Sequence, residues 1–250
     1  MEKRLSAAVA TTLVLAAAYY FLTQAVRFNL AATAAAAPDT VTVIVDAGHG
    51  GEDGGTSTAD GVRECDLNLA IALRLEQVLA LCGQPVGMVR RTDTAIYSDG
   101  AATFSEKKTS DLKNRAALVN AAPRAILVSI HQNHFPQDRY DGAQVFYAKT
   151  DGSEALAQLT QGTLRAALDP ENDRQIKAGD AIYLLEAIDC PGILVECGFL
   201  SNAAEAKRLQ DPLYQQKIAC AVSSAVIRYL ESEAQAHESE NHILLYSLRQ

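Results

Sequence analysis

The chain alternates between short apolar runs and longer segments with helical periodicity. Three runs rich in β-branched residues lie at Val41–Val45, Ala125–Ile130 and Gly192–Glu196, and polar residues or glycine bound each of them. Runs of this length and composition predict strands that are buried on both faces of a sheet. Weaker strand candidates lie at 85–90 and 142–147.

Between these runs, apolar residues recur every three or four positions, which predicts amphipathic helices. The predicted helices cover residues 66–82, 111–120, 153–168, 202–209 and 213–231. The stretch Thr94–Ser110 lacks this period and is expected to form a surface loop. Because strands alternate with helices, the predicted fold class is α/β: a single domain with a twisted, mostly parallel sheet and helices on both faces.

The N-terminal 27 residues differ from the rest of the chain. A basic start is followed by Leu5–Val26, which carries no charge, and then by Arg27. A signal-peptide core has roughly 7 to 15 apolar residues and a membrane-spanning helix about 20, so residues 1–27 are predicted to be a signal peptide or a membrane anchor. The small residues at Ala31–Ala37 offer a cleavage site, and both alternatives stay open. Either one predicts an exported protein.

The domain organisation follows from these boundaries. Residues 28–40 are predicted to be a linker, residues 41–231 the folded domain, and residues 232–250 a C-terminal tail.

Composition and charge narrow the classes of function. The chain is 48% hydrophobic and only 21% charged, which favours a folded protein over a disordered one. Its formal net charge is −8, and the basic N-terminus contributes +2, so the remainder carries −10. An acidic domain without clustered lysine or arginine repels a phosphate backbone, which argues against nucleic acid as a partner.

The chain has five cysteines, an odd number, so at least one cannot be paired within it. Cys82 and Cys220 lie within apolar helical patterns and Cys197 lies beside a predicted strand. We expect these three to be small hydrophobic residues of the core without a chemical role.

Polar residues stand where the three apolar strands end. Asp46 and His49 follow the first strand, His131 follows the second, and Glu196 ends the third. In open α/β sheets ligands bind outside the carboxyl ends of the strands. The four side chains are therefore expected to converge on one site.

Two imidazoles and a carboxylate are a common ligand set for catalytic zinc, which keeps a further position for water. Glu64 is the expected carboxylate, because the glycines of residues 50–55 allow the chain to fold back toward the sheet edge. Glu196 is then left as the second carboxylate, which moves protons in the reaction.

Each of these residues also has a simpler interpretation. His49 is compatible with a solvated turn residue, and Glu64 with an acid that stabilises the N-terminus of the following helix. His134 competes with His131 as a ligand, although it lies in the loop after the strand. Glu196 is expected to be desolvated, and a buried carboxylate needs a partner or a function.

Four linked motifs resemble the zinc-dependent N-acetylmuramoyl-L-alanine amidases. They are Val45–Gly51, Glu64 with Asn68, Ser129–Asn133 and Leu194–Asn202. Three further features resemble that family, namely Arg91 with Asp93, Leu112 with Arg115, and Pro191. The resemblance covers residues 41–230, and Ala47 stands where the family usually has proline.

The resemblance implies a site and a reaction. It implies one zinc ion held by His49, Glu64 and His131, with Glu196 as the catalytic carboxylate, in a phosphorylase/hydrolase-like fold. The implied substrate is peptidoglycan, in which the amide between N-acetylmuramic acid and L-alanine is hydrolysed. We expect Asn133 and Gly51 to orient this substrate.

The segments Ser129–Phe135 and Gly142–Tyr147 resemble the sporulation members of the family. This finer resemblance implies a role in spore cortex, where removal of stem peptides allows muramic-δ-lactam to form. A protein partner that activates the enzyme and membrane contact through the N-terminal segment are also expected. Two rivals stay open: a zinc carboxypeptidase-like wall peptidase, and an inactive peptidoglycan-binding protein.

Overall fold

The computed structural model describes residues 40–247, and only the backbone from residue 237 onward. The predicted signal or anchor at 1–27, nearly all of the linker, and the last three residues lie outside the described residues. No helix in the described part of the chain combines the length and the apolar character that crossing a membrane requires.

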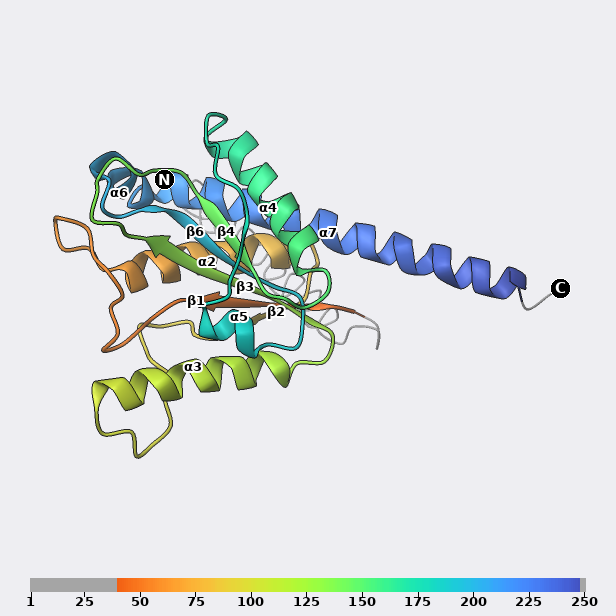
Figure 1. Cartoon of the computed structure of the whole chain (residues 1–250), viewed down its shortest axis with the longest axis horizontal. Helices are drawn as coiled ribbons and strands as arrows, with labels where there is room; N and C mark the ends of the chain where they lie inside the picture. The colour runs from red at the N-terminus through yellow and green to blue at the C-terminus, as the bar shows by residue number, and fades with distance from the viewer. Residues whose placement is uncertain (1–39, 248–250) are drawn as a thin grey trace, which may run out of the picture. The chain divides into compact units, whose positions relative to one another are not determined.

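A six-stranded sheet lies at the centre of the described domain, and Figure 1 shows its twist. The strands are β1 (Thr42–Ala47), β2 (Val86–Met88), β3 (Ala125–Asn133), β4 (Gln144–Tyr147), β5 (Lys177–Ala178) and β6 (Gly192–Phe199). They are ordered β2-β1-β3-β6-β4-β5, and only the pairing of β4 with β6 is antiparallel. The three strands that precede the candidate site residues are therefore adjacent and parallel.

Helices cover both faces of this sheet (Figure 1). One face is covered by α2 (Glu64–Leu81), α4 (Ser153–Leu168) and α7 (Pro212–Ser247), and the other by α3 (Phe104–Asn120) and α5 (Tyr183–Ala187). The short helix α6 (Ala203–Leu209) follows β6. The predicted fold class, a single α/β domain with a mostly parallel sheet, is confirmed.

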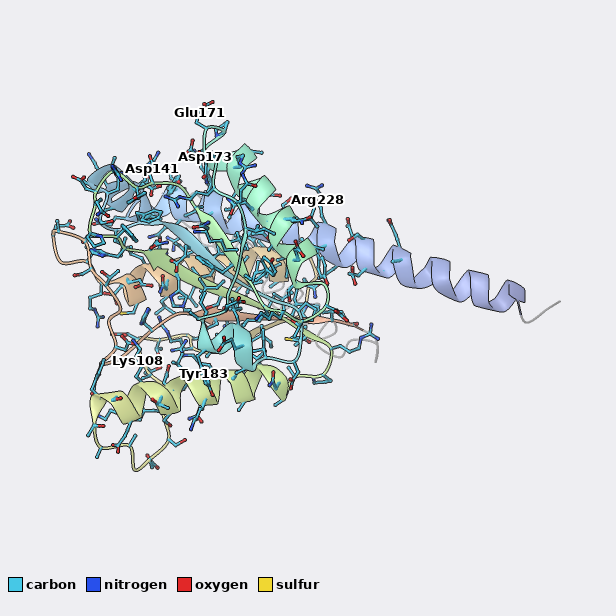
Figure 2. The ribbon with its side chains drawn as sticks, viewed as in Figure 1. Lys108, Asp141, Glu171, Asp173, Tyr183 and Arg228 are labelled. Carbon is cyan, nitrogen blue, oxygen red and sulfur yellow. The ribbon has the colours of Figure 1, made fainter. Side chains whose placement is uncertain are left out.

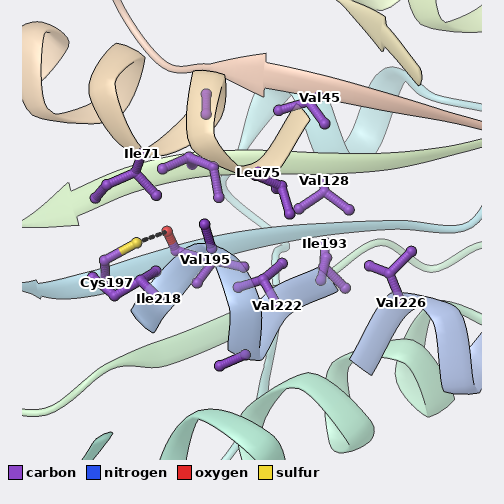
Figure 3. Close-up of a cluster of buried hydrophobic side chains, with 14 of the residues drawn as sticks. Val45, Ile71, Leu75, Val128, Ile193, Val195, Cys197, Ile218, Val222 and Val226 are labelled. Atoms are coloured by element: carbon purple, nitrogen blue, oxygen red, sulfur yellow. Dashed lines mark hydrogen bonds between the residues drawn. The ribbon is translucent and has the colours of Figure 1, made fainter. Parts of the chain in front are cut away.

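The core lies mainly between the sheet and the helices α2, α4 and α7 (Figure 3). Val128 and Val195 come from the central strands, and Ile71 of α2 and Val222 of α7 pack in the same cluster. Each of these side chains is fully buried, and such burial stabilises the fold by about 1.5–3 kcal/mol per residue. This packing makes the central strands a rigid support for the groups at their ends.

Most predicted elements are confirmed, and the differences have local causes. The prediction of a loop over Thr94–Ser110 is wrong in part, because α3 begins at Phe104. Its first turn is stabilised by a capping box between Thr103 and Glu106, which apolar periodicity does not reveal. Strand β3 continues to Asn133, and α7 runs past Glu231 without a break.

The prediction for the cysteines is confirmed for Cys197, which is buried, and wrong for Cys82 and Cys220, which are exposed. Cys82 is the C-cap residue that directly follows the last turn of α2.

Two buried arginines hold the backbone where β1 ends. Arg115 of α3 donates hydrogen bonds to the carbonyl oxygens of Ala47 (3.0 Å) and His49 (2.7 Å). Arg90, just after β2, donates to the carbonyl oxygens of Ala47 (2.8 Å) and Gly48 (3.0 Å). Three consecutive carbonyl groups are thus fixed by two guanidinium groups, which sets the path of the chain into the candidate site.

The charge of Arg115 is balanced by two carboxylates. Its guanidinium lies 2.5 Å from Asp46 Oδ1 and 2.6 Å from Asp111 Oδ2. Burial alone would raise the pKa of Asp46, but Arg115 and the hydroxyl of Ser129 lower it below its ordinary value. The folded-state pKa of Asp46 is thus below the unfolded one, so this group contributes stability above about pH 4 and loses that contribution as the pH falls.

We predict that Arg115→Met lowers the free energy of unfolding by about 3–5 kcal/mol at neutral pH, because two carboxylates lose their buried counter-charge. The deficit should shrink as the pH falls from neutral toward about 4, because without Arg115 burial raises the pKa of Asp46 and its protonation removes the unpaired charge. Urea unfolding of the metal-free protein measures both effects. Lys113→Met, an exposed change on the same helix, should stay within about 0.5 kcal/mol of the parent. Equal effects of the two changes would contradict the role of Arg115.

Candidate metal centre

The three predicted ligands come together at the carboxyl edge of the sheet. His49 follows β1, Glu64 is the first residue of α2, and His131 lies in β3. Glu64 Oε1 lies 3.3 Å from His49 Nε2 and 3.1 Å from His131 Nδ1. One donor atom of each residue lies within 4.8 Å of the other two. Residues distant in the sequence thus present three ligand atoms to one point.

The backbone around these ligands needs glycine. His49 has a φ of 61°, a left-handed conformation that non-glycine residues rarely adopt. A Cβ atom at Gly48 would lie 2.1 Å from His131 Nε2, so the imidazole packs directly on the backbone there. A Cβ atom at Gly55 would lie 2.5 Å from Glu64 Oε2, and Gly55 also has a positive φ of 69°. The glycine-rich turn thus lets the side chains approach.

Buried amides fix the carboxylate of Glu64. Its Oε1 accepts hydrogen bonds from the backbone N–H of Gln132 (3.2 Å) and from Asn68 Nδ2 (3.3 Å), and its Oε2 accepts one from the N–H of Thr56 (3.0 Å). Asn68 also donates to the carbonyl of Gly48 (3.1 Å) and accepts from Gln132 Nε2 (3.1 Å). A ligand held by such supporting groups is oriented before a metal arrives.

The titration of these groups reflects their mutual attraction. Burial alone would lower the pKa of His49, but hydrogen bonds to Asp53 and Glu64 raise it to about 9. Burial alone would raise the pKa of Glu64, but His131 and His49 hold it well below its ordinary value. Glu64 is therefore ionised, and a metal ion that bound here would have to displace the proton that His49 shares with its neighbours.

Glu196 lies beside this group. It pairs in register with His131 on the neighbouring parallel strand, so the two side chains share one face of the sheet. Within the described part of the chain, its buried Oε2 has no hydrogen-bond partner. Burial, assisted by Glu64 and opposed by His131, raises the pKa of Glu196 to about 7. A buried carboxyl oxygen without a partner indicates a chemical function.

The donor set fits a zinc ion. Two imidazole nitrogens and a carboxylate oxygen are ligands that zinc prefers, and a cation shared by all three would neutralise Glu64. A second group of potential ligands, Cys65, Asp66 and Asp93, already has a cation beside it. There Arg63 already supplies the cation, because its Nη2 lies 2.7 Å from both Asp66 Oδ1 and Asp93 Oδ2.

The remaining candidate residues from the sequence lie outside the group of three potential ligands. His134 is exposed and lies outside the group of three ligands. Asn133 ends β3 at the same edge as His131. Gly51 donates its N–H to Asp93 Oδ1 (2.8 Å), which holds the glycine turn against the following loop.

Sequence reasoning selected Arg91 and missed Arg90. Arg91 is exposed and pairs with Glu76 on α2, whereas Arg90 is buried and binds the carbonyls of the turn. The two arginines are adjacent, and the feature that distinguishes Arg90 is its position directly after Val89, a buried residue that follows β2. Asp46 is among the residues expected at the site and Asn68 belongs to a motif of the resemblance, but their supporting contacts, and those of Gln132, do not follow from the sequence pattern.

Comparisons with known proteins agree with this geometry. The profile of the Amidase_3 family, described as N-acetylmuramoyl-L-alanine amidase, matches residues 43–228. The germination-specific N-acetylmuramoyl-L-alanine amidase of Bacillus subtilis is 36% identical over 197 residues, which cover 78% of this chain and 82% of that protein.

Solved structures of the same family have the same fold. The CwlD amidase from Clostridioides difficile, in complex with the GerS lipoprotein, is 40% identical with a TM-score of 0.74, and the match covers 76% of this chain and 98% of that one. An N-acetylmuramoyl-L-alanine amidase from Clostridium difficile 630 is 33% identical with a TM-score of 0.68, covering 78% and 98%. These matches confirm the predicted resemblance, including the one to the sporulation amidases. The chain belongs to the Amidase_3 family of N-acetylmuramoyl-L-alanine amidases.

Proposed function

We propose that this chain hydrolyses the amide bond between N-acetylmuramic acid and L-alanine in peptidoglycan, with one zinc ion held by His49, Glu64 and His131. The observation that carries the proposal is the convergence of these three side chains beside Glu196, whose buried Oε2 has no hydrogen-bond partner among the described residues. The family match supports the choice of bond.

Zinc, when bound, supplies a Lewis acid that polarises the scissile carbonyl and acidifies water. Glu196 accepts a proton from the attacking water and returns it to the leaving amine nitrogen of L-alanine. Its buried position suits both steps. Desolvation raises the pKa of Glu196 to about 7, so near neutral pH the group can both accept and release a proton. A nearby cation would lower this pKa and favour the ionised form that accepts the proton.

The remaining residues hold these groups in place. His49 and His131 are fixed by the glycine turn and by the rigid end of β3. Asn133, at the same edge, offers an amide that can hydrogen-bond to the substrate. For Gly51 we propose a contact with substrate through its carbonyl group alone, because its N–H already donates to Asp93.

We predict that Glu196→Gln lowers turnover by about 10²–10⁴-fold, because glutamine cannot carry the proton, while zinc stays bound. Mass spectrometry of peptidoglycan digests measures released stem peptides, and metal analysis measures zinc. Glu171→Gln, a change at an exposed residue in the loop after α4 (Figure 2), is the matched control and should retain activity.

The products also separate the rival functions. Intact stem peptides support the amidase, whereas a released terminal amino acid identifies a carboxypeptidase-like peptidase. Zinc at one ion per chain with no product from any wall fragment, even with the activating partner present, supports a peptidoglycan-binding protein. Full activity of Glu196→Gln would refute the role assigned to Glu196.

The relatives suggest where the enzyme acts. One is named germination-specific, and another is a CwlD structure in complex with the GerS lipoprotein. We therefore propose spore-cortex peptidoglycan as the substrate, with muramic-δ-lactam as its later product, and a protein partner that activates this chain. Residues 1–27 are proposed to export the domain or to anchor it at the membrane, with 28–40 as linker and 232–250 as a C-terminal tail into which α7 continues as far as Ser247.

We predict that the purified chain alone, with saturating zinc, releases stem peptides from spore-cortex peptidoglycan slowly, and that adding the lipoprotein partner raises the rate. The measurement is the initial rate of peptide release with and without that partner. A rate that the partner leaves unchanged would refute the need for activation without affecting the assignment of the bond.

A further inference from the structure

Asp53 lies directly behind the metal-facing imidazole of His49. Its Oδ2 is 2.9 Å from His49 Nδ1, and its Oδ1 accepts a hydrogen bond from the N–H of Gly55 (3.2 Å). The other nitrogen of the ring, Nε2, lies 3.3 Å from Glu64 Oε1. The two nitrogens of His49 thus face two different carboxylates.

This arrangement sets both the tautomer and the direction of the ring. When Nδ1 donates its proton to a carboxylate, the lone pair of the neutral imidazole is left on Nε2. Carboxylate partners of this kind orient histidine ligands in metal sites and increase their basicity. His49 stands in a strained left-handed conformation in a turn, so its ring lacks the support that a strand gives to His131.

Asp53 is itself held from α3. Lys108 Nζ lies 3.2 Å from Asp53 Oδ2, and Lys108 comes from the N-terminal half of that helix, as Figure 2 shows. The preceding acid, Glu52, forms a separate pair with Lys107 at 2.7 Å. Two adjacent acids therefore contact two adjacent lysines, and of these two acids Asp53 is the one that contacts His49.

We propose that Asp53 is a positioning residue of the metal centre, which holds His49 with Nε2 directed at the ion and is held in turn by Lys108. This inference rests on the proposed function, because it needs the metal site. It assigns Asp53 no contact with substrate.

The alternative is a structural ion pair on the surface. The side chains of Asp53 and Lys108 are 22% and 45% exposed, so their attraction is screened by water and contributes little to stability. A merely structural Asp53 would therefore change unfolding slightly and metal affinity not at all. A positioning Asp53 changes metal affinity strongly while unfolding of the metal-free protein stays nearly the same.

The test is the zinc dissociation constant, measured by competition with a chromophoric chelator, for the chain and four variants. Asp53→Ala should bind zinc about 10–100-fold more weakly. Asp53→Asn should lose less zinc affinity than Asp53→Ala, because its amide oxygen still accepts a hydrogen bond from His49 Nδ1. Lys108→Ala should lose less than about fivefold, the limit for an exposed ion pair. Glu52→Gln is the matched control and should stay within about twofold.

Two further readouts complete the test. The visible spectrum of the cobalt(II)-substituted protein should change in Asp53→Ala, because the geometry at one ligand changes, and should be unchanged in Glu52→Gln. Urea midpoints of the metal-free proteins should fall only slightly in Asp53→Ala, because its contacts with His49 and Lys108 are partly exposed, and should not fall in Glu52→Gln. Unchanged zinc affinity in Asp53→Ala overturns the proposal, and so does an equal loss in Glu52→Gln. If the parent chain itself binds no zinc, the metal centre fails, which is a distinct result.

Discussion

The path of the backbone after β1 is the constraint on which the site depends. Left to itself, this segment would avoid the left-handed conformation of His49, but Arg115 and Arg90 bind three successive carbonyls and fix it. Charged donors form stronger hydrogen bonds than neutral ones, and burial strengthens them further. Their cost is the burial of two cations, which Asp46 and Asp111 offset for Arg115. The rigid sheet then brings His131 and Glu196 to the same place.

Much of this organisation could be predicted from the sequence, because it follows from periodicity and chain direction. Buried β-branched runs predict parallel strands, and parallel strands place His49, His131 and Glu196 at one edge. Glu64 was harder to place, since it stands at the start of α2 and reaches the edge only through the glycine turn. Its assignment from sequence relied on the family resemblance as much as on spacing.

The supporting groups could not be predicted, because their roles arise from contacts between distant segments. Arg90 and Arg91 are equivalent in composition, and only tertiary packing buries one of them. Asp53 reads as an ordinary acid in a glycine turn, yet the fold places it behind His49. The start of α3 was missed because a capping box, not an apolar stripe, defines it. Contacts of this kind leave no periodic pattern in the sequence, so periodicity cannot predict them.

The central claim is that His49 Nε2, Glu64 and His131 Nδ1 bind one zinc ion. Anomalous diffraction at the zinc edge, from crystals of the zinc-loaded chain, tests it directly. We predict a single strong peak at coordination distance from all three atoms, on the side where Glu196 lies. A peak at the Cys65, Asp66 and Asp93 group, or no peak between the two histidines at full zinc occupancy, would contradict it.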